Sequence, residues 1–106
     1  MTTEQFEQII RRRMELGLET LAHKAKEYAK GDRLHNFKRG GEVMGCSPER
    51  ALLGYMTKHL VSVVDIIDDI EKGHAPTQTY WDEKLGDLYN YVLLLDAVVT
   101  ERITPK

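Results

Sequence analysis

The placement of the helix breakers most constrains what this chain can fold into. Its 106 residues include three prolines, Pro48, Pro76 and Pro105. Proline disrupts a helix interior but is tolerated in the first helical turn and beyond the last one. Each of the three falls where a helix would begin or has already ended. This placement predicts an all-α chain.

The spacing of apolar residues predicts three long helices and one short helix. The first should begin at Thr2 or Thr3 and end near Gly31, and the short one should span 36–44. The third should start at Ser47-Pro48, run to about residue 72, and present a core stripe of Leu52, Leu53, Met56, Leu60, Val63, Val64, Ile67 and Ile70. The last should run from Thr79, in a capping box with Asp82, to about residue 100. We therefore expect one domain, residues 1–106, folded as an antiparallel helical bundle.

Composition and charge exclude several classes of protein. The chain is 42% hydrophobic and 30% charged, which is typical of a soluble globular domain. Its formal net charge of −2 provides no general attraction for nucleic acid or anionic membranes. Cys46 is the single cysteine, so an intrachain disulfide is excluded. The N-terminus lacks the features of a signal peptide, no apolar run is long enough to span a bilayer, and we expect a cytoplasmic protein.

The beginning of the last predicted helix carries three oxygen-bearing side chains on one face. Glu83, Asp87 and Asn90 are four and three residues apart, which is helical spacing. Such a group is typical of a metal or phosphate site. Acidic residues in a first turn also favour the positive end of the helix dipole without any further function. The segment alone leaves both interpretations open.

Further acids lie near the end of the preceding helix, at Asp65, Asp68 and Asp69, where negative charge is unfavourable. An antiparallel hairpin would bring them level with the acids of the last helix. A divalent cation, Mg²⁺ or Mn²⁺, would offset the resulting repulsion, although Lys58, Lys72 and Lys84 can neutralise part of it. The expected metal ligands are therefore Glu83, Asp87, Asp65, Asp68 and Asp69.

Other polar and aromatic residues have more than one interpretation. The basic run 11–13 is expected to be ion-paired with neighbouring glutamates of its own helix. His59 is more typical of a hydrogen-bonded boundary histidine than of a ligand. Four aromatic side chains could stack on a base but are more often core residues at helical spacing: Phe37, Trp81, Tyr89 and Tyr91.

The acidic segment resembles a known family. Glu83-x-x-Gly86-Asp87-Leu88-x-Asn90-Tyr91, followed by an aliphatic run, is similar to the last core helix of MazG-like all-α nucleotide pyrophosphohydrolases, whose usual motif is E-E-L-G-D-L. The order of Lys24-x-x-Glu27-Tyr28, Asn36-Phe37 and Lys58-His59 resembles small phage-encoded members, including dATP/dGTP diphosphohydrolase-like domains. The resemblance covers roughly residues 22–100. The chain departs from the family at Lys84, which replaces the second glutamate, and on the preceding helix, where E-x-x-E is usual.

The resemblance implies hydrolysis of (d)NTPs to a monophosphate and pyrophosphate with Mg²⁺ or Mn²⁺. It implies that Glu27 or Asp65 orients or deprotonates the attacking water. It also implies nucleotide or phosphate contacts from Lys24, Lys38, Arg39, Lys58 and Asn90, and assembly into a dimer or tetramer. The nearly all-apolar last helix independently suggests burial by a further chain. The alternative is a non-catalytic helical interaction protein, such as a phage or host accessory factor.

Overall fold

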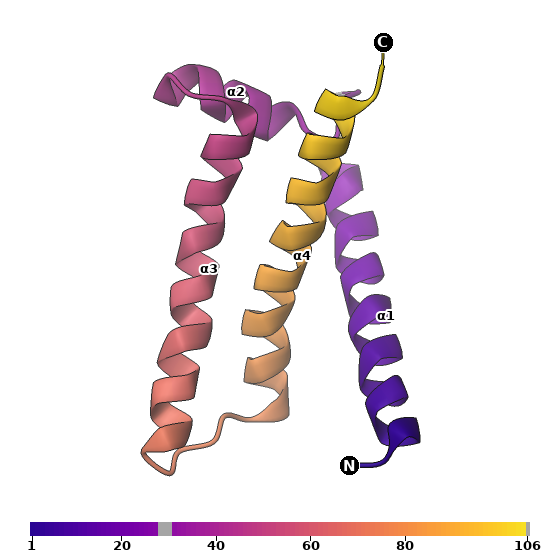
Figure 1. Cartoon of the computed structure of the whole chain (residues 1–106), viewed down its shortest axis with the longest axis vertical. Helices are drawn as coiled ribbons and strands as arrows, with labels where there is room; N and C mark the ends of the chain where they lie inside the picture. The colour runs from indigo at the N-terminus through magenta and orange to yellow at the C-terminus, as the bar shows by residue number, and fades with distance from the viewer. Residues whose placement is uncertain (28–30, 106) are drawn as a thin grey trace.

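The chain folds into four helices (Figure 1). The structure, a computed structural model, describes residues 1–27 and 31–105, except for the side chains of residues 24–27. The helices are α1 Thr3–Glu27, α2 His35–Met44, α3 Pro48–Glu71 and α4 Gln78–Ile103, and the described residues contain no strand. The predicted all-α fold with three long helices and one short helix is confirmed. None of the helices in the described part has the length and apolar character needed to span a membrane.

Local sequence signals explain most of the helix ends. The Ser47 hydroxyl accepts a 3.1 Å hydrogen bond from the Arg50 amide, and Pro48 occupies the first turn of α3. Gly45 ends α2 in the left-handed conformation, at φ +70°, which favours glycine. The predicted start of α4 was wrong, because Thr77, not Thr79, caps this helix by accepting from the Tyr80 amide at 3.2 Å. The expected end of α1 near residue 31 falls next to residues 28–30, which lie outside the described part.

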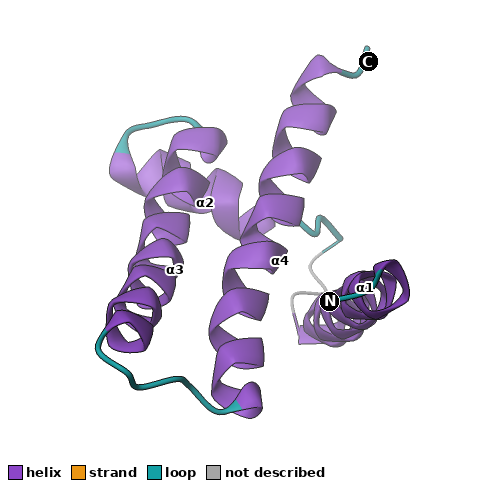
Figure 2. Ribbon diagram, turned by 60° about the horizontal axis from the view of Figure 1, so that its bottom comes forward, coloured by secondary structure: helices purple, strands orange, loops and turns teal. Residues whose placement is uncertain are grey.

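Helix α4 is the central element of the fold. It packs antiparallel to α3, while α1 lies along its other side and runs in the same direction as α4 (Figures 1 and 2). Helix α2 packs against the N-terminal end of α3. Within the described residues, α1 contacts α4 but neither α2 nor α3. The three long helices therefore do not enclose one shared core.

The buried core is small and lies where α2, α3 and α4 meet. Its apolar residues are Leu34, Phe37, Ala51, Leu52, Val63, Ile66 and Val98. The predicted core stripe of α3 was right for Leu52 and Val63, but Leu53, Leu60, Val64, Ile67 and Ile70 are exposed. Ile66, which the predicted stripe omitted, is buried instead. Adjacent apolar pairs occur at 63–64 and 66–67, and the structure buries the first member of each.

Candidate functional site

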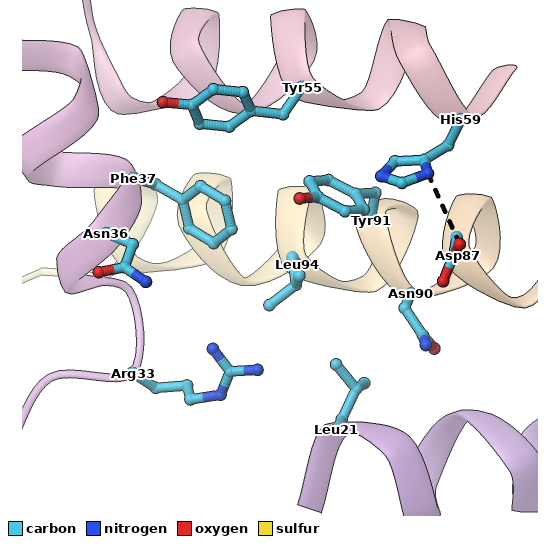
Figure 3. Close-up of a pocket in the computed structure, with 10 residues that line it drawn as sticks. All are labelled: Leu21, Arg33, Asn36, Phe37, Tyr55, His59, Asp87, Asn90, Tyr91 and Leu94. Carbon is cyan, nitrogen blue, oxygen red and sulfur yellow. Dashed lines mark ion pairs between the residues drawn. The ribbon is translucent and has the colours of Figure 1, made fainter. Parts of the chain in front are cut away.

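All four helices contribute to a cavity of about 450 Å³ (Figure 3). This volume lies within the range of about 300–1,000 Å³ that is usual for small-molecule sites. Its lining is both aromatic and polar, and consists of Leu21, Arg33, Asn36, Phe37, Tyr55, His59, Asp87, Asn90, Tyr91 and Leu94. We refer to it as the four-helix cavity.

Aromatic rings form one wall of the four-helix cavity. The Phe37 ring lies 6.4 Å from Tyr55 and 6.3 Å from Tyr91, with an edge-on arrangement to Tyr91. The His59 ring lies 4.6 Å from Tyr91 and is tilted by 34°. These centroid distances are typical of interacting aromatic pairs. The wall thus presents planar, apolar surfaces to the space of the cavity.

An imidazole and a carboxylate face each other at the other end of the cavity. His59 Nδ1 lies 3.8 Å from Asp87 Oδ2 (Figure 3), and the two side chains are 23% and 34% exposed. Both are therefore partly shielded and still accessible to a ligand. Such a pair can orient a water molecule or accept a proton from it. Arg33 extends toward the same space from the loop before α2 (Figure 3).

Asn90 contributes a buried amide whose oxygen has no partner. The residue is 7% exposed, and its Oδ1 atom makes no hydrogen bond within the described part of the chain. Leaving a buried acceptor unpaired costs about 1–3 kcal/mol. Such an atom, in a residue that lines a cavity, indicates a site for a hydrogen-bond donor supplied by a ligand.

Gly17 allows α1 to approach the Asn90 side of α4 closely. A Cβ atom at this position would lie 2.7 Å from Tyr89 Cε1 and 3.1 Å from Asn90 Oδ1. Any larger residue would therefore push against both side chains. The missing side chain at Gly17 therefore allows α1 to pack closely over Tyr89 and Asn90.

A second cavity of about 260 Å³ lies between α1 and α4 and shares Asp87 and Asn90 with the first. Glu83 and Thr20 also line it. Three of the predicted site residues, Glu83, Asp87 and Asn90, are thus brought together. Lys84 Nζ lies 3.6 Å from Glu83 Oε1, as expected if this lysine neutralises part of the acidic charge.

Asp82 binds the basic residues of α1 instead of forming a helix cap. Its carboxylate accepts hydrogen bonds from Arg12 Nη1 at 2.9 Å, Arg13 Nη2 at 3.0 Å and Gln78 Nε2 at 3.0 Å. The Arg12 hydrogen bond, the strongest influence, holds the pKa of Asp82 well below its usual range. The expectation that residues 11–13 pair within their own helix was therefore wrong for Arg12 and Arg13, which connect α1 to α4.

The acids of α3 do not join this group. Asp65, Asp68 and Asp69 are exposed, and none of them lines the four-helix cavity or the cavity between α1 and α4. Among the side chains that the structure describes, no three His, Cys, Asp or Glu form a group that could hold a metal ion. The five predicted metal ligands therefore do not converge within a single chain.

The predicted phosphate-binding cations lie elsewhere. Lys38 forms ion pairs with Asp32, at 2.6 Å, and with Glu101, and its hydrogen bond lowers the pKa of Asp32. Arg39 pairs with Glu42 at 2.6 Å, and Lys58 is exposed on α3. None of the three lines the four-helix cavity. Lys24 and Glu27 lie in the last turn of α1, but their side chains are outside the part of the chain that the structure describes, so their assigned roles stay predictions.

Several lining residues were not among those predicted for the site. Tyr55 and His59 lie one helical turn apart on α3, and Tyr91 and Leu94 follow the predicted Asp87 at intervals of four and three residues on α4. Helical spacing shows that each set shares a face, but it does not show that the two faces meet. Phe37 and Tyr91 are two of the four aromatic residues that could stack on a base, whereas Arg33 lies in the loop before α2 and Asn36 in its first turn.

No protein-family model matches the chain, and searches of curated proteins and of solved structures found no match. The function therefore has to be inferred from the site itself.

Proposed function

We propose that the four-helix cavity binds a nucleoside triphosphate and that the protein hydrolyses it to a nucleoside monophosphate and pyrophosphate. The observation that carries this proposal is the combination of an aromatic wall, the His59–Asp87 pair and the unpaired Asn90 oxygen around one cavity. A nucleotide consists of a planar base, a hydroxylated sugar and charged phosphates, and these parts match the aromatic and polar parts of the cavity.

The aromatic wall suits the base. Phe37, Tyr55 and Tyr91 offer ring faces or edges on which a flat heterocycle can pack. Base–aromatic stacking typically contributes about 1–3 kcal/mol. The Asn90 oxygen would accept a hydrogen bond from a base amino group or a sugar hydroxyl, and this bond would remove the cost of leaving the oxygen unpaired.

The acidic end suits phosphates only together with a cation. Glu83 and Asp87 would repel a triphosphate, but Mg²⁺ is commonly held by one or two carboxylates together with substrate phosphates. These two side chains line the smaller cavity between α1 and α4, which shares Asp87 and Asn90 with the four-helix cavity, and they would therefore hold the ion without the acids of α3. When bound, Mg²⁺ neutralises phosphate charge and lowers the pKa of a coordinated water.

The chain's own residues would handle the proton. Water attacks the α-phosphorus, the bond between this phosphorus and the bridging oxygen breaks, and pyrophosphate leaves with the bonding electron pair. His59 accepts the proton of the attacking water, and its neighbour Asp87 orients the imidazole ring. Asp65 takes neither role, because it does not line either cavity.

A matched pair of variants tests the hydrolase. The full chain is incubated with each dNTP and NTP, with and without Mg²⁺ or Mn²⁺, and the products are separated by ion-exchange chromatography. Asp87→Asn should reduce turnover by about 10²–10⁴-fold, a range typical for the loss of an acid–base group. Asp69→Asn, in an exposed residue outside both cavities, should leave turnover within about twofold of wild type.

The absence of monophosphate and pyrophosphate above the Asp87→Asn background, for every nucleotide and either metal, would contradict the hydrolase. Release of inorganic phosphate instead of pyrophosphate would contradict cleavage between the α and β phosphates. Equal losses from Asp69→Asn and Asp87→Asn would show that the acids of α3 take part after all.

The second candidate function is a helical interaction protein, and exposed apolar residues favour it. Leu53, Leu60, Val64 and Ile67 are all exposed on α3. Large exposed apolar patches commonly mark sites of protein association. Nucleotide titration distinguishes the two functions, because an interaction protein without a nucleotide site shows no saturable binding of a non-hydrolysable triphosphate.

A further inference from the structure

A groove of about 710 Å³ runs between α1 and α4, outside the candidate site. We call it the arginine groove, and it is lined by Ile9, Ile10, Arg12, Arg13, Met14, Gln78, Trp81, Leu85 and Tyr89. None of these residues lines the four-helix cavity, although Arg13 also lines the smaller cavity between α1 and α4. The volume of the groove lies within the range of about 300–1,000 Å³ that is usual for small-molecule sites.

The walls of the arginine groove are mainly aliphatic. Ile9, Ile10 and Met14 of α1 are exposed, and Leu85 of α4 is partly buried. These side chains form no strong hydrogen bonds, and methionine adapts its shape readily to its neighbours. The lining residues of α4 extend over positions 78–89, which is about 16 Å along the helix. A ligand that fills the groove therefore needs an elongated apolar part.

The charged side chains in the described lining of the arginine groove are all cations. They are Arg12 and Arg13, and both bind the carboxylate of Asp82, so two positive charges share one negative charge. The next acid along α4, Glu83, pairs with Lys84. The Arg12 side chain is 49% exposed, whereas that of Arg13 is 13% exposed. Arg12 is therefore the cation that a ligand in the groove can reach.

Arg12 has hydrogen-bonding capacity for a second carboxylate. Its guanidinium group carries five N–H donors, and its bonds to Asp82 come from Nη1 and Nη2. The Asp82 carboxylate accepts from Arg12, Arg13 and Gln78, which occupies its roughly four lone-pair positions. Arginine binds carboxylates through planar, charge-assisted hydrogen bonds. The groove thus combines one cationic anchor with an apolar wall.

We propose that the arginine groove binds an alkyl carboxylate, the anion of a fatty acid, with its carboxylate on Arg12 and its alkyl chain against the aliphatic wall. The carboxylate supplies the negative charge that the lining lacks, and the chain removes exposed apolar surface from water. An uncharged hydrocarbon would leave Arg12 without this partner, and a small anion would leave the wall hydrated. The inference does not depend on the proposed function, because the groove and the four-helix cavity have no lining residue in common.

Trp81 reports directly on this groove, because it is the single tryptophan of the chain and belongs to the lining. The full chain is titrated with dodecanoate below its critical micelle concentration while Trp81 fluorescence is recorded, and circular dichroism checks that the helix content is constant. We expect a saturable change. Acetate, which has the charge without the chain, should cause none. Dodecylammonium, which has the chain with the opposite charge, should bind at least about tenfold more weakly than dodecanoate.

Arg12→Gln and Arg11→Gln form a matched pair on α1. Both variants lose one positive charge, but Arg11 is exposed and does not line the arginine groove. Arg12→Gln should raise the dissociation constant of dodecanoate at least about tenfold, because charge-assisted hydrogen bonds to the ligand are lost. Arg11→Gln should leave this constant within about twofold of the wild-type value. Equal dodecanoate affinities in the two variants would overturn the proposal.

NMR of the wild-type chain provides a test that does not depend on the folding of a variant. Nuclear Overhauser effects should connect the methylene protons of dodecanoate with the methyl groups of Met14 and Leu85 and with the Trp81 ring. Contacts confined to exposed apolar residues of α3, such as Leu60 and Ile67, would show that the chain adsorbs without the arginine and would overturn the proposal. The absence of a saturable change in Trp81 fluorescence would overturn it as well.

Discussion

Asn90 combines deep burial with an unpaired hydrogen-bond acceptor. Such an atom lowers stability unless a ligand uses it, so its energetic role depends on whether the site is filled. A substitution at Asn90 should therefore affect the stability of the free protein and its affinity for a ligand in opposite directions.

Asn90→Leu should therefore keep or raise the stability of the free protein. The substitution removes the unpaired oxygen while keeping a similar shape, and the expected gain is between zero and about 3 kcal/mol. Urea denaturation followed by circular dichroism measures it. Nucleotide affinity, measured by titration calorimetry, should fall at least about tenfold, which corresponds to about 1.4 kcal/mol.

Asn36→Leu is the control, because Asn36 lines the same cavity but is exposed. It should change the stability by less than about 0.5 kcal/mol. A clear loss of stability in Asn90→Leu together with unchanged nucleotide affinity would show that Asn90 has a structural role instead.

At the scale of elements, Asp82 connects α1 to α4. Its side chain is 17% exposed and accepts hydrogen bonds from Arg12 and Arg13. Because few other contacts hold α1, this cluster should matter more to the docking of α1 than to the α3–α4 hairpin. Asp82→Asn should lower the free energy of unfolding by about 1–3 kcal/mol at pH 7.

The same carboxylate makes this effect dependent on pH. The pKa of Asp82 lies below its ordinary value of 3.8 when α1 is docked, so its contribution is fully present above the unfolded pKa and decreases as the pH falls below about 5. The stability difference between wild type and Asp82→Asn, measured by urea denaturation at several pH values, should therefore shrink toward pH 3. The exposed Asp68→Asn serves as the control, and a difference that stays constant with pH would contradict the role of the charged group.

The close approach of α1 to α4 at Gly17 gives a second prediction at this scale. Gly17→Ala places a methyl group within 2.7 Å of the Tyr89 ring, whereas nothing lies within 4 Å of a Cβ atom at Gly54. Gly54→Ala should stabilise the chain by up to about 1 kcal/mol through helix propensity. Gly17→Ala should be less stable than Gly54→Ala by about 1–3 kcal/mol in thermal or urea denaturation, owing to overpacking. Equal effects would mean that α1 does not hold this position in solution.

The helices themselves could be predicted from local signals. Ser47-Pro48 and Gly45 act through their own backbone conformation and nearest hydrogen bonds, so the sequence indicates them directly. It is harder to predict which side of α3 is buried. Adjacent apolar residues such as Ile66 and Ile67 point in directions about 100° apart around the helix, and the apolar spacing alone does not show which of the two is buried. The role of Asp82 depended on the register of α1 against α4, across 69 and 70 residues of sequence.

At the scale of the whole molecule, the open arrangement of helices has a thermodynamic consequence. If folding is coupled to association of two copies, the melting temperature must depend on protein concentration. A hundredfold increase in concentration should raise the wild-type Tm measurably by differential scanning calorimetry, and the increase should be smaller for Leu60→Glu, which places a charge among the exposed apolar residues of α3. A Tm independent of concentration, with matching van't Hoff and calorimetric enthalpies, would indicate a folded monomer.

The candidate site could be predicted only in part, because it depends on how the helices pack against one another. Asp87 and Asn90 were identified because they share one helix face with Glu83. The aromatic wall joins Phe37, Tyr55 and Tyr91 from three helices, and only the packing of those helices brings the rings together. The acids of α3 are exposed and line neither the four-helix cavity nor the cavity between α1 and α4.

The most direct test of the central claim, that the four-helix cavity binds a nucleotide, is NMR of the full chain with a non-hydrolysable triphosphate analogue and Mg²⁺. We expect intermolecular nuclear Overhauser effects between base protons and the rings of Phe37, Tyr55 and Tyr91, together with shifts of the His59 ring. Tyr80, which lines neither cavity on the candidate site, should be unaffected. No saturable change up to millimolar nucleotide, or contacts confined to Trp81, which lines neither cavity of the candidate site, would contradict nucleotide binding in the four-helix cavity.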